Sequence, residues 1–229
     1  MRKFYSGLLV VAFTVLSSIC FGQISVTATA GTTGPTTYTT LKGAFDAINA
    51  GTHQGSITIN VTGNTTETAS AVLNASGTGA ASYTAVLIQP TATATISGNI
   101  AGPLIDLNGA DNVTIDGRIN STGTTRSLTL SNTSTSNAAG TSTTRMINSA
   151  QNNTLNYLII EGSSTLNADA TATVLIDSSL TGGGNMNITI SNNDIGAAGG
   201  NTPALAIYSV GESGTLANSN ITVSNNLIH

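Results

Sequence analysis

The sequence predicts an all-β fold: a parallel β-helix, or solenoid of stacked coils, with one capping α-helix at its N-terminal end. Three observations support this class. Short runs of β-forming residues with a period of two resemble one another along the chain. One amphipathic helix precedes these runs. Thr, Asn, Ser and Gly together supply about half of the 229 residues, whereas charged residues supply 7%, far fewer than in an ordinary α/β enzyme.

The first segment, residues 1–22, is typical of a secretory signal peptide. Arg2 and Lys3 precede an apolar run, Leu8–Leu16, that is too short to span a membrane. No later segment is long and apolar enough to form a membrane span. Cys20 would leave with the signal, so the mature chain could form neither a disulfide nor a cysteine-ligated metal site. We therefore expect a secreted protein, either extracellular or held at the cell surface.

Charge limits the partners of the mature chain. Without the signal it would keep four basic and ten acidic residues, a net charge of −6. So few cations cannot neutralise a row of phosphates, which argues against nucleic acid as a partner. The sequence contains no phosphate-binding loop or zinc-protease motif, and we predict no cofactor. His53 and His229 stand alone, so we predict no metal site and expect each to be a solvated turn histidine.

The helix is expected over residues 40–50. Apolar residues recur at i, i+3, i+4 and i+7 from Leu41 to Ile48, which is the spacing of one helical face. Thr40 is suited to cap the first turn, and Gly51 stands where a left-handed residue ends a helix. We expect residues 23–37 to form a lead segment and residues 38–229 to form the β-helix domain.

Two groups of similar runs define the predicted repeats, which recur every 30 to 40 residues, as in a solenoid. The first group shares the pattern Asn-hydrophobic-Thr-hydrophobic and comprises Asn112–Gly117, Asn187–Asn192 and Asn220–Asn225, with a looser copy at Tyr157–Gly162. The second group comprises Leu104–Leu107, Met146–Ser149, Leu175–Ser178 and Ala206–Ser209.

These segments, with the helix at residues 41–49 and the run at residues 56–61, resemble the pectin-lyase-like right-handed parallel β-helices over residues 38–229. In that family a short helix covers the N-terminal end of the coil. The family includes lyases, hydrolases, adhesins and passive stalks, so the resemblance implies the fold far more strongly than an activity. No catalytic residue of the family can be transferred to this sequence.

Asp116 and Glu161 are the only candidate catalytic residues, and they are weak ones. Alignment of the first group places them in one column on adjacent coils, where outward-pointing carboxyl groups would lie about 5 Å apart, close enough for acid–base chemistry or a shared cation. In the second group, Asp106 and Asp177 share a column with Asn148 between them. The competing interpretation is that all of these are solvated residues of an outer face. Arg118 could pair with Asp116.

We expect a structural or adhesive role for a secreted or cell-surface β-helix, without evident catalysis. The alternative is a polysaccharide-active lyase or glycoside hydrolase, or a carbohydrate-binding β-helix. Expected partners are extracellular polysaccharide or cell-surface components, together with further domains of the same longer chain. No amphipathic closing element follows the last repeat, so we expect the β-helix to be incomplete at its C-terminus.

Overall fold

The computed structural model describes residues 22–166, 171–179, 182–211 and 213–229. Over these residues the chain is a parallel β-solenoid of about five turns, which confirms the predicted fold class. The predicted signal peptide lies outside the described residues, apart from Gly22. None of the described helices is long and apolar enough to cross a membrane.

Each coil contributes strands to three sheets, named A, B and C. Along the solenoid, the coil strands of sheet A are β3 (His53–Val61), β6 (Tyr83–Pro90), β9 (Val113–Asp116), β12 (Thr154–Asn156), β15 (Met186–Ser191) and β18 (Ser219–Ser224). Those of sheet B are β4 (Thr65–Glu67), β7 (Ala94–Gly98), β10 (Leu128–Asn132), β13 (Ile159–Gly162), β16 (Asp194–Ala197) and β19 (Leu227–Ile228). Those of sheet C are β5 (Ala71–Asn74), β8 (Pro103–Asn108), β11 (Ser142–Ile147), β14 (Ala172–Ile176) and β17 (Ile207–Ser209). Two short 3₁₀ helices, η1 (Ile119–Ser121) and η2 (Gly214–Leu216), lie in the connections.

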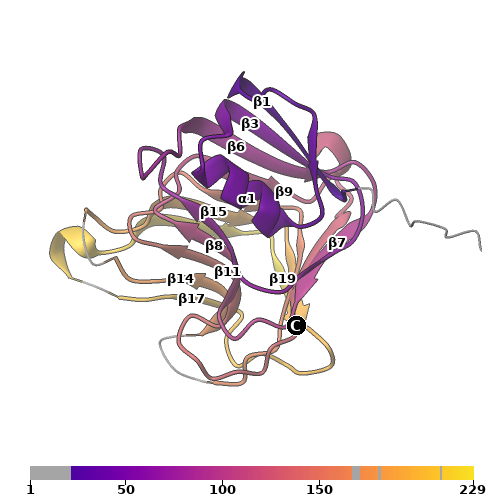
Figure 1. Cartoon of the computed structure of the whole chain (residues 1–229). Coiled ribbons are helices and arrows are strands. Elements are labelled where there is room, and N and C mark those ends of the chain that lie inside the picture. Colours follow the sequence, from indigo (N-terminus) through magenta and orange to yellow (C-terminus); the bar gives the residue numbers. More distant parts are fainter. Residues whose placement is uncertain (1–21, 167–170, 180–181, 212) are drawn as a thin grey trace, which may run out of the picture.

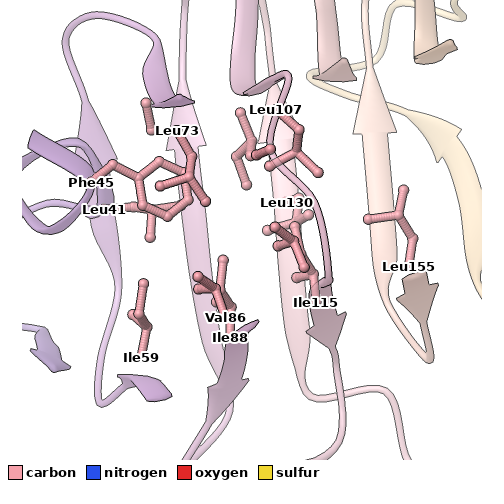
Figure 2. Packing of buried hydrophobic residues seen from close by; sticks show 14 of the residues in the cluster. Leu41, Phe45, Ile59, Leu73, Val86, Ile88, Leu107, Ile115, Leu130 and Leu155 are labelled. Atoms are coloured by element: carbon pink, nitrogen blue, oxygen red, sulfur yellow. The ribbon is translucent and has the colours of Figure 1, made fainter. Parts of the chain in front are cut away.

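The interior is a narrow stack of aliphatic side chains. One column of sheet A runs through successive coils and contains Ile59, Ile88, Ile115, Leu155, Ile190 and Val223. All of its members except Val223 are fully buried. Figure 2 shows this stack from the helix end, where Leu41 and Phe45 pack, to Leu155. Alternation of apolar and polar residues along each strand produces the column, because successive side chains point to opposite faces of a sheet.

The segment expected to be a simple lead is part of sheet A. β1 (Ile24–Gly31) pairs antiparallel with β3, and β2 (Thr36–Tyr38) pairs antiparallel with β1. Ile24 and Val26 point inward and are fully buried, so the first strand supplies core as well as backbone hydrogen bonds. The last strand of sheet A at this end has only three residues, and short edge strands offer little to an approaching chain.

The predicted capping helix is confirmed as α1 (Leu41–Asn49). Thr40 caps it, since its side-chain oxygen accepts a hydrogen bond from the Gly43 N–H at 3.1 Å. Gly51 follows with φ +74°, and a Cβ there would lie 2.6 Å from the carbonyl oxygen of Ala80, so only glycine fits. Figure 1 shows α1 in front of the solenoid interior, with the three sheets around it.

Polar contacts fasten α1 to the edges of two sheets. Glu67, which is 2% exposed on β4, accepts hydrogen bonds from the backbone N–H groups of Leu41 and Lys42 at 2.8 and 3.0 Å. At the other end of α1, the Asn49 side chain donates to the carbonyl of Val72 at 2.8 Å and accepts from the N–H of Asn74 at 3.0 Å. Glu67 therefore satisfies free N–H groups at the start of α1, and Asn49 satisfies backbone edge groups of β5, which has no preceding coil to pair with.

Asparagine forms the corners that precede the sheet A strands. Asn112, Asn152, Asn187 and Asn220 all have φ between 53° and 59°, a left-handed conformation that asparagine tolerates. Their amides form a ladder, in which Asn187 donates to Asn152 at 2.9 Å and Asn220 donates to Asn187 at 3.0 Å. This periodic placement explains why the Asn-hydrophobic-Thr-hydrophobic pattern recurs.

One predicted repeat was assigned to the wrong sheet. The looser copy at Tyr157–Gly162 contains β13, which belongs to sheet B and pairs with β10 and β16. The sheet A strand of that coil is β12, where Thr154 pairs with Thr114 and Thr189. Short β runs with similar residues occur in all three sheets, so the hydrophobic pattern alone did not distinguish them.

The C-terminal end of the described solenoid lacks a comparable cover. β17, β18 and β19 each lie last in their sheets, with one edge unpaired in the part of the chain that the structure describes. Val223, Leu227 and Ile228 are 49%, 55% and 51% exposed, although their counterparts in the preceding coil, Ile190, Asp194 and Ile195, include two fully buried isoleucines. We call this surface the open end face.

Candidate functional site

The predicted pair of stacked acids does not form. Asp116 lies on β9 in sheet A, and its neighbour on the next coil is Asn156. Glu161 lies on β13 in sheet B, beside Ser131 and Gly196. The column expected to join the two acids came from the misassigned repeat. Two carboxyl groups on different sheets cannot act as stacked neighbours, so the structure offers no support for joint acid–base work or a shared cation at this pair.

Asp116 is also not the solvated outer residue that alternation suggested. It is only 3% exposed, and Arg118 binds it through two parallel contacts, Nε to Oδ1 at 2.9 Å and Nη2 to Oδ2 at 2.6 Å. The expected Arg118–Asp116 pair is therefore confirmed. The Arg118 guanidinium also lies 4.7 Å from the ring centroid of Tyr157. The hydrogen bond with Asp116 is the main reason that the pKa of Arg118 is raised.

A second arginine, Arg126, is linked through Asn192 to Asn156, the residue before Tyr157. Arg126 Nε donates to the carbonyl of Asn192 at 2.6 Å, and the Asn192 side chain bonds to Asn156. Arg126 forms no ion pair with a described carboxylate within 4 Å. Arg118 therefore uses its donors mainly on the Asp116 carboxylate, whereas Arg126 donates to a backbone carbonyl.

The second acid column has a different register from the one predicted. Asp106 pairs across the sheet with Arg145, and Arg145 with Leu175, whereas Asn148 falls outside this row. Arg145 binds Asp106 through Nε and Nη2 at 3.0 and 2.9 Å and reaches Asp177 through Nη1 at 3.3 Å. Burial lowers the pKa of Arg145, but the two carboxylates outweigh burial, and the net shift is upward.

We did not predict this bridging role of Arg145 from the sequence. The available signal was its position between two acids, 39 residues after Asp106 and 32 before Asp177. Those separations match the repeat, so opposite charges on neighbouring coils would meet across sheet C. The arrangement joins three coils of the solenoid through one partly buried cation.

The two histidines lie in the first and last coils. His53 is fully buried rather than a solvated turn residue. Its ring contacts the Tyr38 hydroxyl at 2.8 Å and the Thr32 carbonyl at 2.6 Å. His229 is exposed and contacts Asp194 at 2.8 Å. Within the described residues, no group of three His, Cys, Asp or Glu side chains is placed to hold a metal ion.

Burial also raises the pKa values of Tyr38, Tyr83 and Asp111. Tyr83, whose hydroxyl donates to the carbonyl of Asn74 at 2.5 Å, has a pKa raised mainly by burial, to which the charge of Asp111 adds. Burial also raises the pKa of Asp111, against the opposing effect of a hydrogen bond from the Gln151 N–H at 2.7 Å. These contacts hold segments between coils.

A polar groove lies on the outside of sheet A. It lies over β15 and β18, near the open end face, and has a volume of about 410 Å³. Its lining residues are Asn187, Thr189, Asn220, Ile221 and Thr222. The side-chain amide of Asn220 donates a hydrogen bond to that of Asn187 in the groove lining, and Thr189 and Thr222 pair across the two strands. We call it the Asn/Thr groove. It offers hydroxyl and amide groups, which can both donate and accept hydrogen bonds.

Compared with protein-family models, with curated proteins and with solved structures, the chain matches none of them. The proposals for its function consequently depend on the geometry of its own residues.

Proposed function

We propose that the chain is a secreted or cell-surface β-helix with a structural or adhesive role, similar to the pectin-lyase-like right-handed coils and part of a larger surface protein. The observation that carries this proposal is that several of the few charged side chains form ion pairs or cap the helix. Glu67 fastens α1, Arg118 neutralises Asp116, and Arg145 joins Asp106 to Asp177. Charges committed to ion pairs and caps stabilise coils, whereas catalytic acids and bases need to face a substrate.

The solenoid itself supports the same proposal. Rows of Asn, Thr and Ser on successive coils form an extended polar surface, and a repeat fold presents such a surface over a length set by the number of coils. The signal-like residues 1–22 favour export. A neutral polar surface of this kind suits contact with hydrated polysaccharide or with other surface proteins.

The location and role can be tested together. Antibodies raised against residues 23–229 should label intact cells of the source organism, and the label should be lost after mild surface proteolysis. Beads coated with the folded chain should adhere to extracellular polysaccharide or cell surfaces. A Leu155→Asp variant, which places a charge in the buried column, is the control and should lose adhesion. A protein found only inside cells, or beads that adhere no better than control beads, would contradict the proposal.

The Asn/Thr groove favours a second candidate, carbohydrate binding. Thr189→Ala combined with Asn220→Ala should weaken retention on the polysaccharide that the chain binds, because both residues line the groove. Thr129→Ala on sheet B is the matched control and should bind normally. Equal retention of all three proteins would remove the groove from the proposal.

A polysaccharide-degrading activity is tested separately. A panel of acidic and neutral polysaccharides should yield no new chain ends if the role is structural or adhesive. If products do form, Asp116→Asn and Glu161→Gln decide whether the originally suspected acids take part. Turnover that survives both substitutions would exclude these two residues while overturning the non-catalytic role.

A further inference from the structure

One connection between sheets A and B is much longer than its counterparts. Residues 117–127 join β9 to β10 with 11 residues, whereas the other described connections from sheet A to sheet B contain two or three. The Ser127 N–H donates to the Gly117 carbonyl at 2.7 Å and closes the base of this loop, which we call the corner loop. In a repeat fold, insertions of this kind lie outside the core and often mark the binding face.

The corner loop is fixed to coils on both sides of its own. The Ser121 hydroxyl donates to Gln89 Oε1 on β6, in the preceding coil, at 2.7 Å. Arg126 Nε donates to the carbonyl of Asn192, two coils further along the solenoid. A loop held at several points loses little conformational freedom when a partner binds it, and binding is stronger for that reason.

Tyr157, which the Arg118 guanidinium covers at 4.7 Å, has an unusual backbone conformation for a tyrosine. Its φ is 51°, and the same corner position in the next two coils is occupied by Asn192 and Asn225, with φ of 59° and 54°. Asparagine tolerates this left-handed region, whereas a bulky side chain is strained there. Because strained residues cluster at functional positions, Tyr157 points to a role beyond turning the corner.

The corner loop also presents an unpaired cation and an exposed aliphatic side chain. Arg126 donates only through Nε to the described residues, so its Nη1 and Nη2 groups are available. Ile119 is 37% exposed, and in the described part of the chain the other exposed large hydrophobic residues all lie in the last coil. Arginine and tyrosine are both enriched in protein–protein interfaces. We call Arg118, Ile119, Arg126 and Tyr157 the corner-loop surface.

We propose that the corner-loop surface is a docking site for an acidic segment of a partner protein, one that carries an aspartate or glutamate beside an apolar side chain. The carboxylate pairs with the two Nη groups of Arg126, a geometry that guanidinium favours, and the apolar side chain covers Ile119. Charge complementarity selects this partner: Asp116 neutralises Arg118, but no described carboxylate neutralises Arg126. An acidic polysaccharide has no apolar side chain with which to cover Ile119.

This proposal goes beyond the structural or adhesive role, since it is tested on the purified chain whatever its location or its adhesion to polysaccharide. A library of random peptides displayed on phage is selected against the folded chain. Selected peptides should be enriched in Asp or Glu beside an aliphatic or aromatic residue. Arg126→Gln and Ile119→Ser should each weaken binding of a selected synthetic peptide by at least about tenfold in fluorescence anisotropy. Lys42→Gln, which removes a positive charge from α1, is the matched control and should bind like the parent.

Tyr157→Asn separates a binding role from a purely structural one. Asparagine suits the left-handed backbone, so relief of strain should offset the lost ring contact and Tm should change by less than about 2 °C. Peptide binding should nevertheless weaken by about tenfold, because Arg118 and the corner loop lose the ring that supports them. A lower Tm with unchanged binding would show that Tyr157 only holds the corner and would remove it from the site.

Two results would overturn the proposal as a whole. One is a set of selected peptides without acidic enrichment, and the other is a peptide that binds the Arg126→Gln variant as tightly as it binds the parent. Alginate, an acidic polysaccharide, provides the competing arm of the test. Alginate binding that depends on Arg126, with no peptide binding that does, would overturn the protein partner in favour of a glycan.

Discussion

The two described ends of the solenoid differ in how far their strand edges and core side chains are covered. At the N-terminal end, Glu67 holds the start of α1, Asn49 pairs with the edge of β5, and the apolar face of the helix, including Phe45, is fully buried. At the open end face the equivalent edges are unpaired, and Leu227 is 55% exposed. Because each coil contacts only its neighbours, closure at one end cannot compensate for the other. Stability in this chain should therefore depend on position along the solenoid.

The largest contrast is expected from apolar truncation at each end. Phe45→Ala should cost about 3–5 kcal/mol in free energy of unfolding, because it empties the space between α1 and the first coil. Leu227→Ala should cost less than about 1 kcal/mol, since most of its side chain is already in water. Urea unfolding followed by circular dichroism measures both. Equal losses would show that the open end face is covered in solution.

A smaller contrast concerns charges at the helix. Glu67→Gln should cost about 2–3 kcal/mol, because one carboxylate oxygen that accepts a backbone N–H becomes an amide donor facing that N–H. Asp46→Asn is the control, with an expected change below about 0.5 kcal/mol, because the Lys42–Asp46 pair is exposed. The same urea titration applies. A neutral Glu67→Gln would mean that α1 is held by its apolar face alone.

Asparagines that link successive coils allow the same comparison within one motif: the N–H of Leu158 donates to Asn193 Oδ1, and the N–H of Asn193 donates to Asn226 Oδ1. Asn193→Ala should cost about 2 kcal/mol, because it leaves the buried N–H of Leu158 without its acceptor and removes the side-chain hydrogen bond to the carbonyl of Leu155. Asn226→Ala in the last coil should cost about 1 kcal/mol or less, since water can replace the lost contacts. Thermal unfolding of the two variants side by side decides the order. A larger loss for Asn226→Ala would reverse the proposed gradient along the solenoid.

The smallest effect is expected between the two ends, at Asp111. Its pKa is raised in the folded chain, so the folded state binds the proton more tightly than the unfolded state. The resulting stability is present below the unfolded pKa, near pH 4, and is lost as the pH rises through the folded pKa. Asp111→Asn should therefore flatten the pH dependence of Tm in this range and raise Tm at pH 7 by about 1–2 °C. Identical pH profiles for the variant and the parent would contradict this assignment.

Local signals in the sequence predicted the helix and the fold class well. The signals for α1 are local to it, and the structure has each of them: Thr40 caps the first turn, the apolar face from Leu41 to Ile48 is buried, and Gly51 follows the helix with a positive φ. The Asn-hydrophobic-Thr-hydrophobic runs predicted the parallel repeats because a left-handed Asn corner recurs at the same place in the coils of β9, β12, β15 and β18.

Register between coils could not be predicted in the same way. Tyr157–Gly162 resembles a sheet A strand but lies in sheet B, and this single misassignment created the false pairing of Asp116 with Glu161. Asp106 was likewise aligned with Asn148 instead of Arg145. Strands of three to six residues contain too few side chains to identify their sheet, and connections of unequal length shift the spacing between coils. The buried state of Asp116 depends on the position of Arg118, which alternation along a strand does not reveal.

The hydrogen bonds between strands run along the solenoid axis, and this direction has a mechanical consequence. Tension applied through the last described coil would separate the strands of one coil at a time, because the strands of that coil are hydrogen-bonded only to those of the preceding coil. A released coil of 33 residues could extend to roughly 110 Å. Among the described coils, detachment would start at the open end face and leave the coils next to α1 intact, so this part of the molecule would lengthen under load in discrete increments.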